Sequence, residues 1–346
     1  MSRAAKTSAW VIMLAVAAGA MIYFAVRPPV GTAASTSSSA MTWDATTTQY
    51  IADQHSKAAL AMQHADFTQV RVILQPLLAK YPADAAGRTL LARALMAQGD
   101  WRAAYTEAKQ SCRIDDHQAE AQMLAGIMAE RFDELPAARQ HYERASELEP
   151  GSVQCSLYLA NVCLKLKDYP NADLYALRVL RLDPSRAIAY AITAQVAAEQ
   201  GQIDRAIEQW RKALLHTQPD SAELLAYTMQ EVMLLRRRDI AGREEAINVL
   251  LSLPESQIAD NRRVTEELAQ TYLSLSRPSD ASDTWWRWLK NHPTDGPAAA
   301  EAGLSAQRAG QTDRARQFLA HAQKIAPDHP LTAALRQTIN DGGSRE

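Results

Sequence analysis

From residue 51 onward, apolar residues recur in helical blocks separated by short turns, and the blocks repeat along the chain. Proline or an equivalent residue ends each pair of blocks, and most of these positions are 34 residues apart. The positions are Pro82, Asp116, Pro150, Pro184 and Gln218, and later Pro293 and Pro327. Proline lacks a backbone N–H and stops a helix. A fixed period of this length predicts a stacked array of helix pairs.

Small residues keep the same phase at places where two helices must approach closely. The first set is Ala92, Gly126, Ala160, Ala194, Ala269 and Gly303. Twelve residues later in each unit stands an alanine, at Ala104, Ala138, Ala172, Ala206, Ala281 and Ala315. The turn between the two helices contains glycine at Gly99 and Gly310, among others. Glycine suits the left-handed backbone that ends a helix.

These spacings and residue sizes resemble the tetratricopeptide repeat family over residues 51–329. The resemblance implies an all-α fold, a right-handed α-solenoid of paired antiparallel helices with about eight units. The unit at 221–261 is degenerate and extended, because seven extra residues interrupt the period between Gln218 and Pro293. We expect helices near 221–238 and 242–252, and a loop around Leu253–Asp260. Residues 330–340 should form a capping helix, and 341–346 a disordered tail.

The amino-terminal part has another pattern, because residues 9–26 are apolar without interruption. As a helix this segment is about 27 Å long, which is close to the hydrocarbon thickness of a bilayer. We predict a transmembrane helix at 9–26, preceding the solenoid, and a flexible Ser/Thr/Ala-rich linker at 27–49. Arg3 and Lys6 precede the helix and only Arg27 follows it closely. This bias places residues 1–8 in the cytoplasm.

The expected location is therefore the inner (cytoplasmic) membrane, with a single pass and the repeat body on the periplasmic or extracytoplasmic side. A small-residue site at 32–34 leaves an alternative open, in which the apolar segment is cleaved and the protein is secreted.

Composition and motifs narrow the function classes. The chain has 37 basic and 39 acidic side chains and a net charge of −2, which gives no reason to expect a nucleic-acid partner. Its three cysteines and eight histidines lack metal-ligand spacing, and phosphate-binding or hydrolase motifs are absent. We therefore expect no catalytic residue, no metal, no cofactor and no small-molecule substrate.

In the tetratricopeptide family, the first helix of each unit lines a concave groove, and the resemblance transfers those positions to this chain. The candidate groove residues are Arg93, Met96, Met123, Ile127, Glu130, Leu157, Asn161, Leu164, Gln195 and Met229. This lining is largely apolar and contains methionine, whose flexible side chain suits adaptable binding. We expect Asn161 to offer its amide to the backbone of a partner.

The resulting hypothesis is a membrane-anchored bacterial scaffold for protein–protein interaction. It would recruit helical or extended segments of partner proteins through the groove, in envelope assembly, secretion or biogenesis. Two alternatives stay open at this point. One is a non-catalytic subunit of a membrane enzyme complex, and the other is a self-assembling structural protein.

Overall fold

The protein is described by a computed structural model that covers residues 43–219 and 221–343. These residues form helices α2 to α19, and the chain divides into two compact units after Gln200. The predicted segments 1–8 and 9–26, and the linker up to residue 42, lie outside the described residues. Within the described part, no helix has the length and apolar character needed to cross a bilayer.

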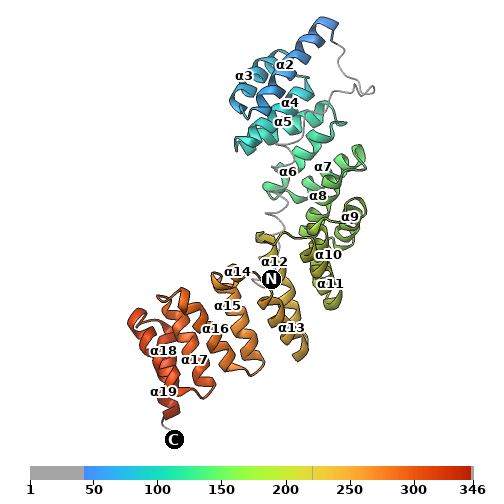
Figure 1. Cartoon of the computed structure of the whole chain (residues 1–346). Coiled ribbons are helices and arrows are strands. Elements are labelled where there is room, and N and C mark those ends of the chain that lie inside the picture. The colour runs from blue at the N-terminus through green and yellow to red at the C-terminus, as the bar shows by residue number, and fades with distance from the viewer. Residues whose placement is uncertain (1–42, 220, 344–346) are drawn as a thin grey trace. The chain divides into compact units, whose positions relative to one another are not determined.

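The first unit is a stack of antiparallel helix pairs (Figure 1). Its helices are α2 (Ala45–Gln63), α3 (Phe67–Lys80), α4 (Ala85–Ala97), α5 (Trp101–Ile114), α6 (Ala119–Arg131), α7 (Leu135–Leu148), α8 (Val153–Lys165), α9 (Tyr169–Leu182) and α10 (Ala187–Glu199). The two helices of each pair from α2/α3 to α8/α9 pack on one another, and the second helix also packs on the first helix of the next pair. Every helix is therefore held by neighbours close in sequence.

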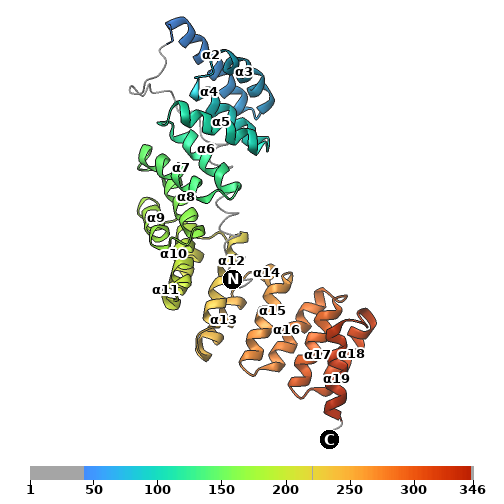
Figure 2. The ribbon, with the colours of Figure 1, turned by 180° about the vertical axis from the view of Figure 1, so that it is seen from behind.

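The second unit has the same construction and ends in a single helix, as the rear view also shows (Figure 2). Its helices are α11 (Ile203–Leu215), α12 (Ala222–Leu235), α13 (Ile240–Leu251), α14 (Glu255–Ala259), α15 (Arg262–Ser274), α16 (Pro278–Asn291), α17 (Gly296–Arg308), α18 (Thr312–Ile325) and α19 (Pro330–Gly343). Helix α19 packs on α17 and α18 and covers that end of the stack, as the sequence predicted.

One backbone feature confirms the repeat phase. A residue with positive φ ends the first helix of successive pairs, and these residues are again 34 apart: Ala65, Gly99, Asp133 and Lys167, and in the second unit Ser276 and Gly310. Their φ values lie between 55° and 80°. Several second helices then begin with an aspartate cap, as at Asp100, whose carboxylate accepts from the Ala103 N–H. The turn is thus fixed by backbone geometry even where glycine is missing.

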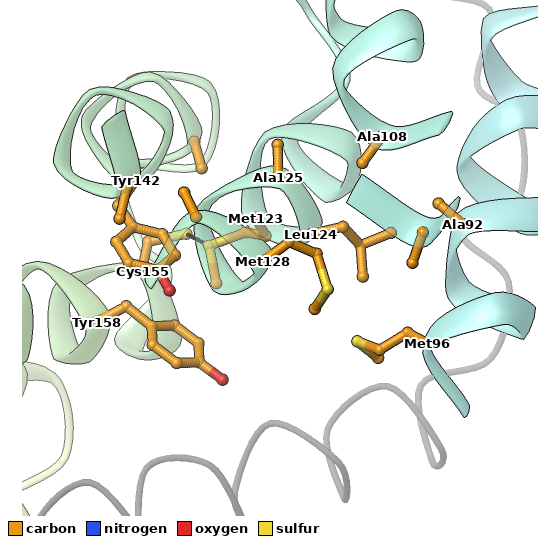
Figure 3. Packing of buried hydrophobic residues seen from close by; sticks show 14 of the residues in the cluster. Ala92, Met96, Ala108, Met123, Leu124, Ala125, Met128, Tyr142, Cys155 and Tyr158 are labelled. Carbon is orange, nitrogen blue, oxygen red and sulfur yellow. Dashed lines mark hydrogen bonds between the residues drawn. The ribbon is translucent and has the colours of Figure 1, made fainter. Parts of the chain in front are cut away.

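The core of the first unit lies between the two helices of each pair and between successive pairs (Figure 3). Ala92 and Ala138, at the predicted small positions, are buried to 1% exposure or less. At Gly126 a Cβ atom would stand 2.5 Å from the ring of Tyr142, so only glycine fits there. The small positions therefore exist because large side chains of the partner helix lie directly on them.

Three predicted boundaries are wrong. Helix α2 begins at Ala45, inside the expected linker, because Asp44 caps it by accepting from the Thr47 N–H at 2.7 Å. The loop expected at 253–260 contains the short helix α14. Helix α19 continues to Gly343, into the tail expected at 341–346. The helices expected near 221–238 and 242–252 correspond to α12 and α13.

Candidate partner-binding site

The candidate groove residues all lie on first helices, namely α4, α6, α8 and α10 in the first unit and α12 in the second. Their exposure divides them into two groups. Six are buried: Arg93, Met96, Met123, Leu157, Asn161 and Met229. Four are half-buried: Ile127, Glu130, Leu164 and Gln195. Only the second group offers side-chain surface of any size to a partner.

Three of the four apolar members of the buried group belong to the core of the first unit, and the fourth, Met229, lies on α12 of the second unit. Met96, Met123 and Leu157 are 4% to 7% exposed and pack within its hydrophobic cluster. The thiol of Cys155 donates to the sulfur of Met123 at 3.4 Å, between α8 and α6 (Figure 3). Met123 therefore joins one repeat to the next. The flexibility that suggested an adaptable groove serves here to fill irregular space between helices.

Arg93 is a charged member of the buried group. It lies on α4 and donates through Nη1 to Glu120 of α6 at 3.0 Å. Its side chain is 4% exposed, so this ion pair is largely shielded from water. A buried guanidinium must be paired to be tolerated, and the next repeat supplies the carboxylate. Arg93 thus joins two successive repeats of the first unit.

Glu130 is the centre of a polar cluster that connects three helices. Its carboxylate accepts from the hydroxyl of Tyr142 on α7 at 2.9 Å. It also accepts from the amide of Asn161 at 2.7 Å and from the ammonium of Lys165 at 2.6 Å, both on α8. Burial, and then the charge of Glu130, raise the pKa of Tyr142 well above its ordinary value, so its hydroxyl keeps the proton that it donates.

The structure therefore gives Asn161 a different partner from the one expected. Its side chain is 2% exposed and its amide hydrogen bond goes to Glu130 of the preceding repeat. Gln195 is more accessible and forms only a bond with Glu199, one turn away on the same helix. Ile127 and Leu164 pack at the edge of the core while keeping part of their surface exposed.

Exposed apolar side chains also lie on second helices, outside the candidate groove. Leu174 and Leu177 on α9 are 54% and 46% exposed, and Trp286 on α16 is 46% exposed. Trp286 also contacts Phe318 edge-to-face, with ring centroids 5.8 Å apart. The signal was present in the sequence, because all three residues fall outside the buried phase of their helices.

The described residues contain one group whose ligand atoms lie close enough together to hold a metal ion. It consists of Asp115, Asp116 and His117 in the turn after α5. Asp116 already accepts from Arg144 at 3.0 Å and lies 2.7 Å from the His117 ring. Both residues are exposed, so these contacts are those of a surface ion-pair network.

These observations define an all-α repeat protein of paired antiparallel helices, a scaffold architecture that is typically non-catalytic. The family model described as tetratricopeptide repeat matches three overlapping stretches, residues 89–153, 124–184 and 157–222. Residues 89–222 of the chain therefore match the tetratricopeptide repeat family.

No curated protein matches the sequence. Among solved structures, the chain is similar to MamA (residues 41 to the end) from Desulfovibrio magneticus RS-1, with 19% identity and a TM-score of 0.46 over 51% of this chain and 97% of that one. It is similar to a tetratricopeptide repeat protein from Parabacteroides merdae ATCC 43184, with 14% identity and a TM-score of 0.47 over 77% and 98%. It is also similar to a chain of Naa15/Naa10 bound to HypK-THB, with 18% identity and a TM-score of 0.46 over 81% of this chain and 43% of that one.

Proposed function

We propose that this chain is a protein–protein interaction scaffold that the segment 9–26 holds at a membrane. The observation that carries the proposal is the stack of helix pairs, in which buried side chains such as Arg93 and Asn161 fix each repeat to the next. A preorganised surface of this kind binds extended or helical segments without ordering itself first. Anchoring would add a high local concentration of the partner at the membrane.

The binding face that we propose is the accessible edge of the first helices in the first unit. Ile127 on α6 and Leu164 on α8 supply apolar surface, and Gln195 on α10 supplies a polar group. The buried methionines behind them keep this face in place rather than contacting the partner. Because apolar contacts dominate, binding should depend weakly on salt.

A capture experiment from native membranes tests the scaffold and its face together. The full chain is compared with Ile127→Glu/Leu164→Glu on the first helices and with the matched pair Leu174→Glu/Leu177→Glu on the second helix α9. We expect the first pair to lose the captured partner and the second pair to retain it, because an unpaired charge in a bound apolar contact is costly.

The reverse pattern, with loss only for the α9 pair, would reject the proposed face while keeping the scaffold. If the wild-type chain crosslinks to no protein above a mock control, the scaffold itself is rejected. A captured catalytic chain would instead favour the role of a non-catalytic subunit in a membrane enzyme complex.

The location proposed here is the inner membrane, with the repeat body outside the cytoplasm, and the process is envelope assembly, secretion or biogenesis. The support is the apolar segment 9–26 and the excess of Arg3 and Lys6 over Arg27 around it. A reporter fused after Asn340 should be active only outside the cytoplasm. Activity restricted to the cytoplasm would refute the orientation, and a mature N-terminus near Ser35 would show cleavage and secretion.

A further inference from the structure

Helix α5 (Trp101–Ile114) has a basic stripe along one side. Lys109 and Arg113 follow Arg102 by seven and eleven positions. On a helix of 3.6 residues per turn, this spacing places the three side chains within about 40° of one another. Arg102 and Arg113 are exposed and Lys109 is half-buried. The same side has a shallow hollow, whose lining is Tyr105, Thr106, Lys109, Gln110 and Arg113.

The three cations lack carboxylate partners. Within residues 43–219 and 221–343, no Asp or Glu lies at ion-pair distance from Arg102, Lys109 or Arg113. The only acidic residue of α5, Glu107, is paired with Arg88 at 2.7 Å. Lys109 instead lies over the ring of Tyr105, at 4.6 Å from its centroid. After burial, the charge of Lys109 is the second cause that lowers the pKa of His141 on α7.

The chemistry of this face is that of a surface for phosphate-bearing lipids. Cations beside aromatic rings, with polar groups in a hollow, are typical of helices that lie on anionic membranes. A second cation–aromatic contact lies at the start of α5, where the guanidinium of Arg131 from α6 is 4.0 Å from the centre of the Trp101 ring. Residues 67–114 have seven basic and three acidic side chains, although the whole chain has a net charge of −2.

The position of this region in the chain identifies the occupant. Residues 27–44 alone separate the apolar segment 9–26 from the first repeat helix, α2. Fully extended, this stretch spans at most about 65 Å, so a membrane anchor at 9–26 would keep the first repeats near the bilayer. We propose that the basic side of α5 docks on anionic phospholipids of that membrane, and that Lys109 and Arg113 take a lipid phosphate in the hollow. This proposal rests on the membrane anchoring proposed above.

The test uses the full chain in two kinds of vesicle, phosphatidylcholine alone and phosphatidylcholine mixed with phosphatidylglycerol. The readout is the reactivity of Lys109 toward an amine reagent, measured by mass spectrometry, with the exposed Lys290 on α16 as internal reference. We expect Lys109 to react more slowly only in the phosphatidylglycerol vesicles, and high salt should remove the protection.

Variants locate the effect while Lys109 remains as the probe. Each cation near an anionic surface strengthens docking by about fivefold, so Arg102→Gln/Arg113→Gln should weaken docking by about twenty-fivefold and abolish the protection. The matched pair Arg263→Gln/Arg287→Gln, exposed residues of the second unit, should leave it unchanged.

Each other result has a definite meaning. Equal reactivity in both vesicles for a chain that resists carbonate extraction overturns the docking and leaves the anchor. Protection that persists in Arg102→Gln/Arg113→Gln overturns it too. So does protection by inorganic phosphate or by soluble polyglutamate without vesicles, since these would show an anion site or an acidic protein partner. Release by carbonate refutes the anchor, and salt-sensitive protection on phosphatidylglycerol vesicles would then still support docking.

Discussion

At the scale of single residues, Glu130 joins its own helix pair and the next one through polar contacts. Three donors from two other helices meet its carboxylate at 2.6 to 2.9 Å. Charge-assisted hydrogen bonds of this length, in a site that is 11% exposed at Glu130, are stronger than neutral ones at the surface. Residues that the groove hypothesis assigned to a partner thus stabilise the array itself.

The first prediction concerns the amide in this cluster. Asn161→Ala should lower the free energy of unfolding by about 1–3 kcal/mol, because it removes a charge-assisted bond to a largely buried carboxylate. Urea denaturation measures this change. The control is Gln195→Ala, whose side chain is half-buried and bonds only one turn away, and which should change stability by less. Equal effects of the two variants would contradict the role given to Asn161.

A second prediction tests the closest helix contact. Gly126→Ala places a Cβ atom 2.5 Å from the ring of Tyr142, and the ring is fully buried. Overpacking of this kind costs about 1–3 kcal/mol. Gly151→Ala is the matched control, because a Cβ atom there has no neighbour within 4 Å. Thermal melting should separate the two variants, and a stable Gly126→Ala would mean that α6 and α7 are farther apart.

A third prediction concerns pH. Glu231 on α12 is 2% exposed, and burial raises its pKa more than the ion pair with Arg211 at 2.7 Å lowers it. Because the pKa of Glu231 in the folded protein lies above the ordinary 4.5, its protonated carboxyl favours the folded state. This contribution to the free energy of unfolding is complete below pH 4.5 and declines as the pH rises through the raised pKa. The unfolding free energy of the wild type should therefore fall relative to Glu231→Gln across this window.

Glu208→Gln is the control for that series. The side chain of Lys212 lowers the pKa of the exposed Glu208, so its contribution has the opposite sign and is lost as the pH falls. Denaturant midpoints at a series of pH values give both differences. A wild-type chain that gained stability relative to Glu231→Gln with rising pH would show that Arg211 outweighs burial.

At the scale of the helices, each repeat depends on its neighbours, and the final helix depends on its packing against α17 and α18. Leu335 of α19 is fully buried. It packs directly on Gly303 of α17, where an added Cβ atom would stand only 2.4 Å from the Cδ2 atom of Leu335. Leu335→Ala should cost about 2–5 kcal/mol locally. In a linear array this loss should appear as faster hydrogen exchange in α17, α18 and α19, with the first unit unchanged.

Leu215→Ala supplies the comparison for this variant, because Leu215 is 79% exposed on α11 and should matter little. If exchange accelerates evenly over both units in Leu335→Ala, the array unfolds as one cooperative body. Helix α19 would then not stabilise only the end of the array on which it packs.

The helices could be predicted from the sequence because their signals are local. Spacing of prolines and small residues fixes where each helix begins and ends, and the same period reappears in the positive-φ residues such as Asp133 and Lys167. Helix α14 was missed because Pro254 and the polar residues after it are typical of a loop, and a helix of five residues with no buried side chain leaves no periodic pattern. The start of α2 was missed because Asp44 caps a threonine-rich turn that has the composition of a linker.

At the scale of the whole molecule, the architecture followed from the repeat, whereas the accessibility of the candidate site did not. Position within a unit correctly places Arg93, Met123 and Asn161 on first helices. It does not reveal their contacts with residues of the adjacent repeats, which are Glu120, Cys155 and Glu130 respectively. Those contacts depend on how closely successive helix pairs stack. Burial between repeats depends on two neighbouring repeats, and a pattern within a single repeat cannot predict it.

Site-specific photo-crosslinking in native membranes tests the central claim most directly. A benzoylphenylalanine is placed at Leu164, at the accessible edge of first helix α8, or at Leu177, which is 46% exposed on second helix α9. The account predicts a discrete crosslinked protein from position 164 and none from position 177. Crosslinks from position 177 alone, or from neither position, would contradict partner binding through the first helices.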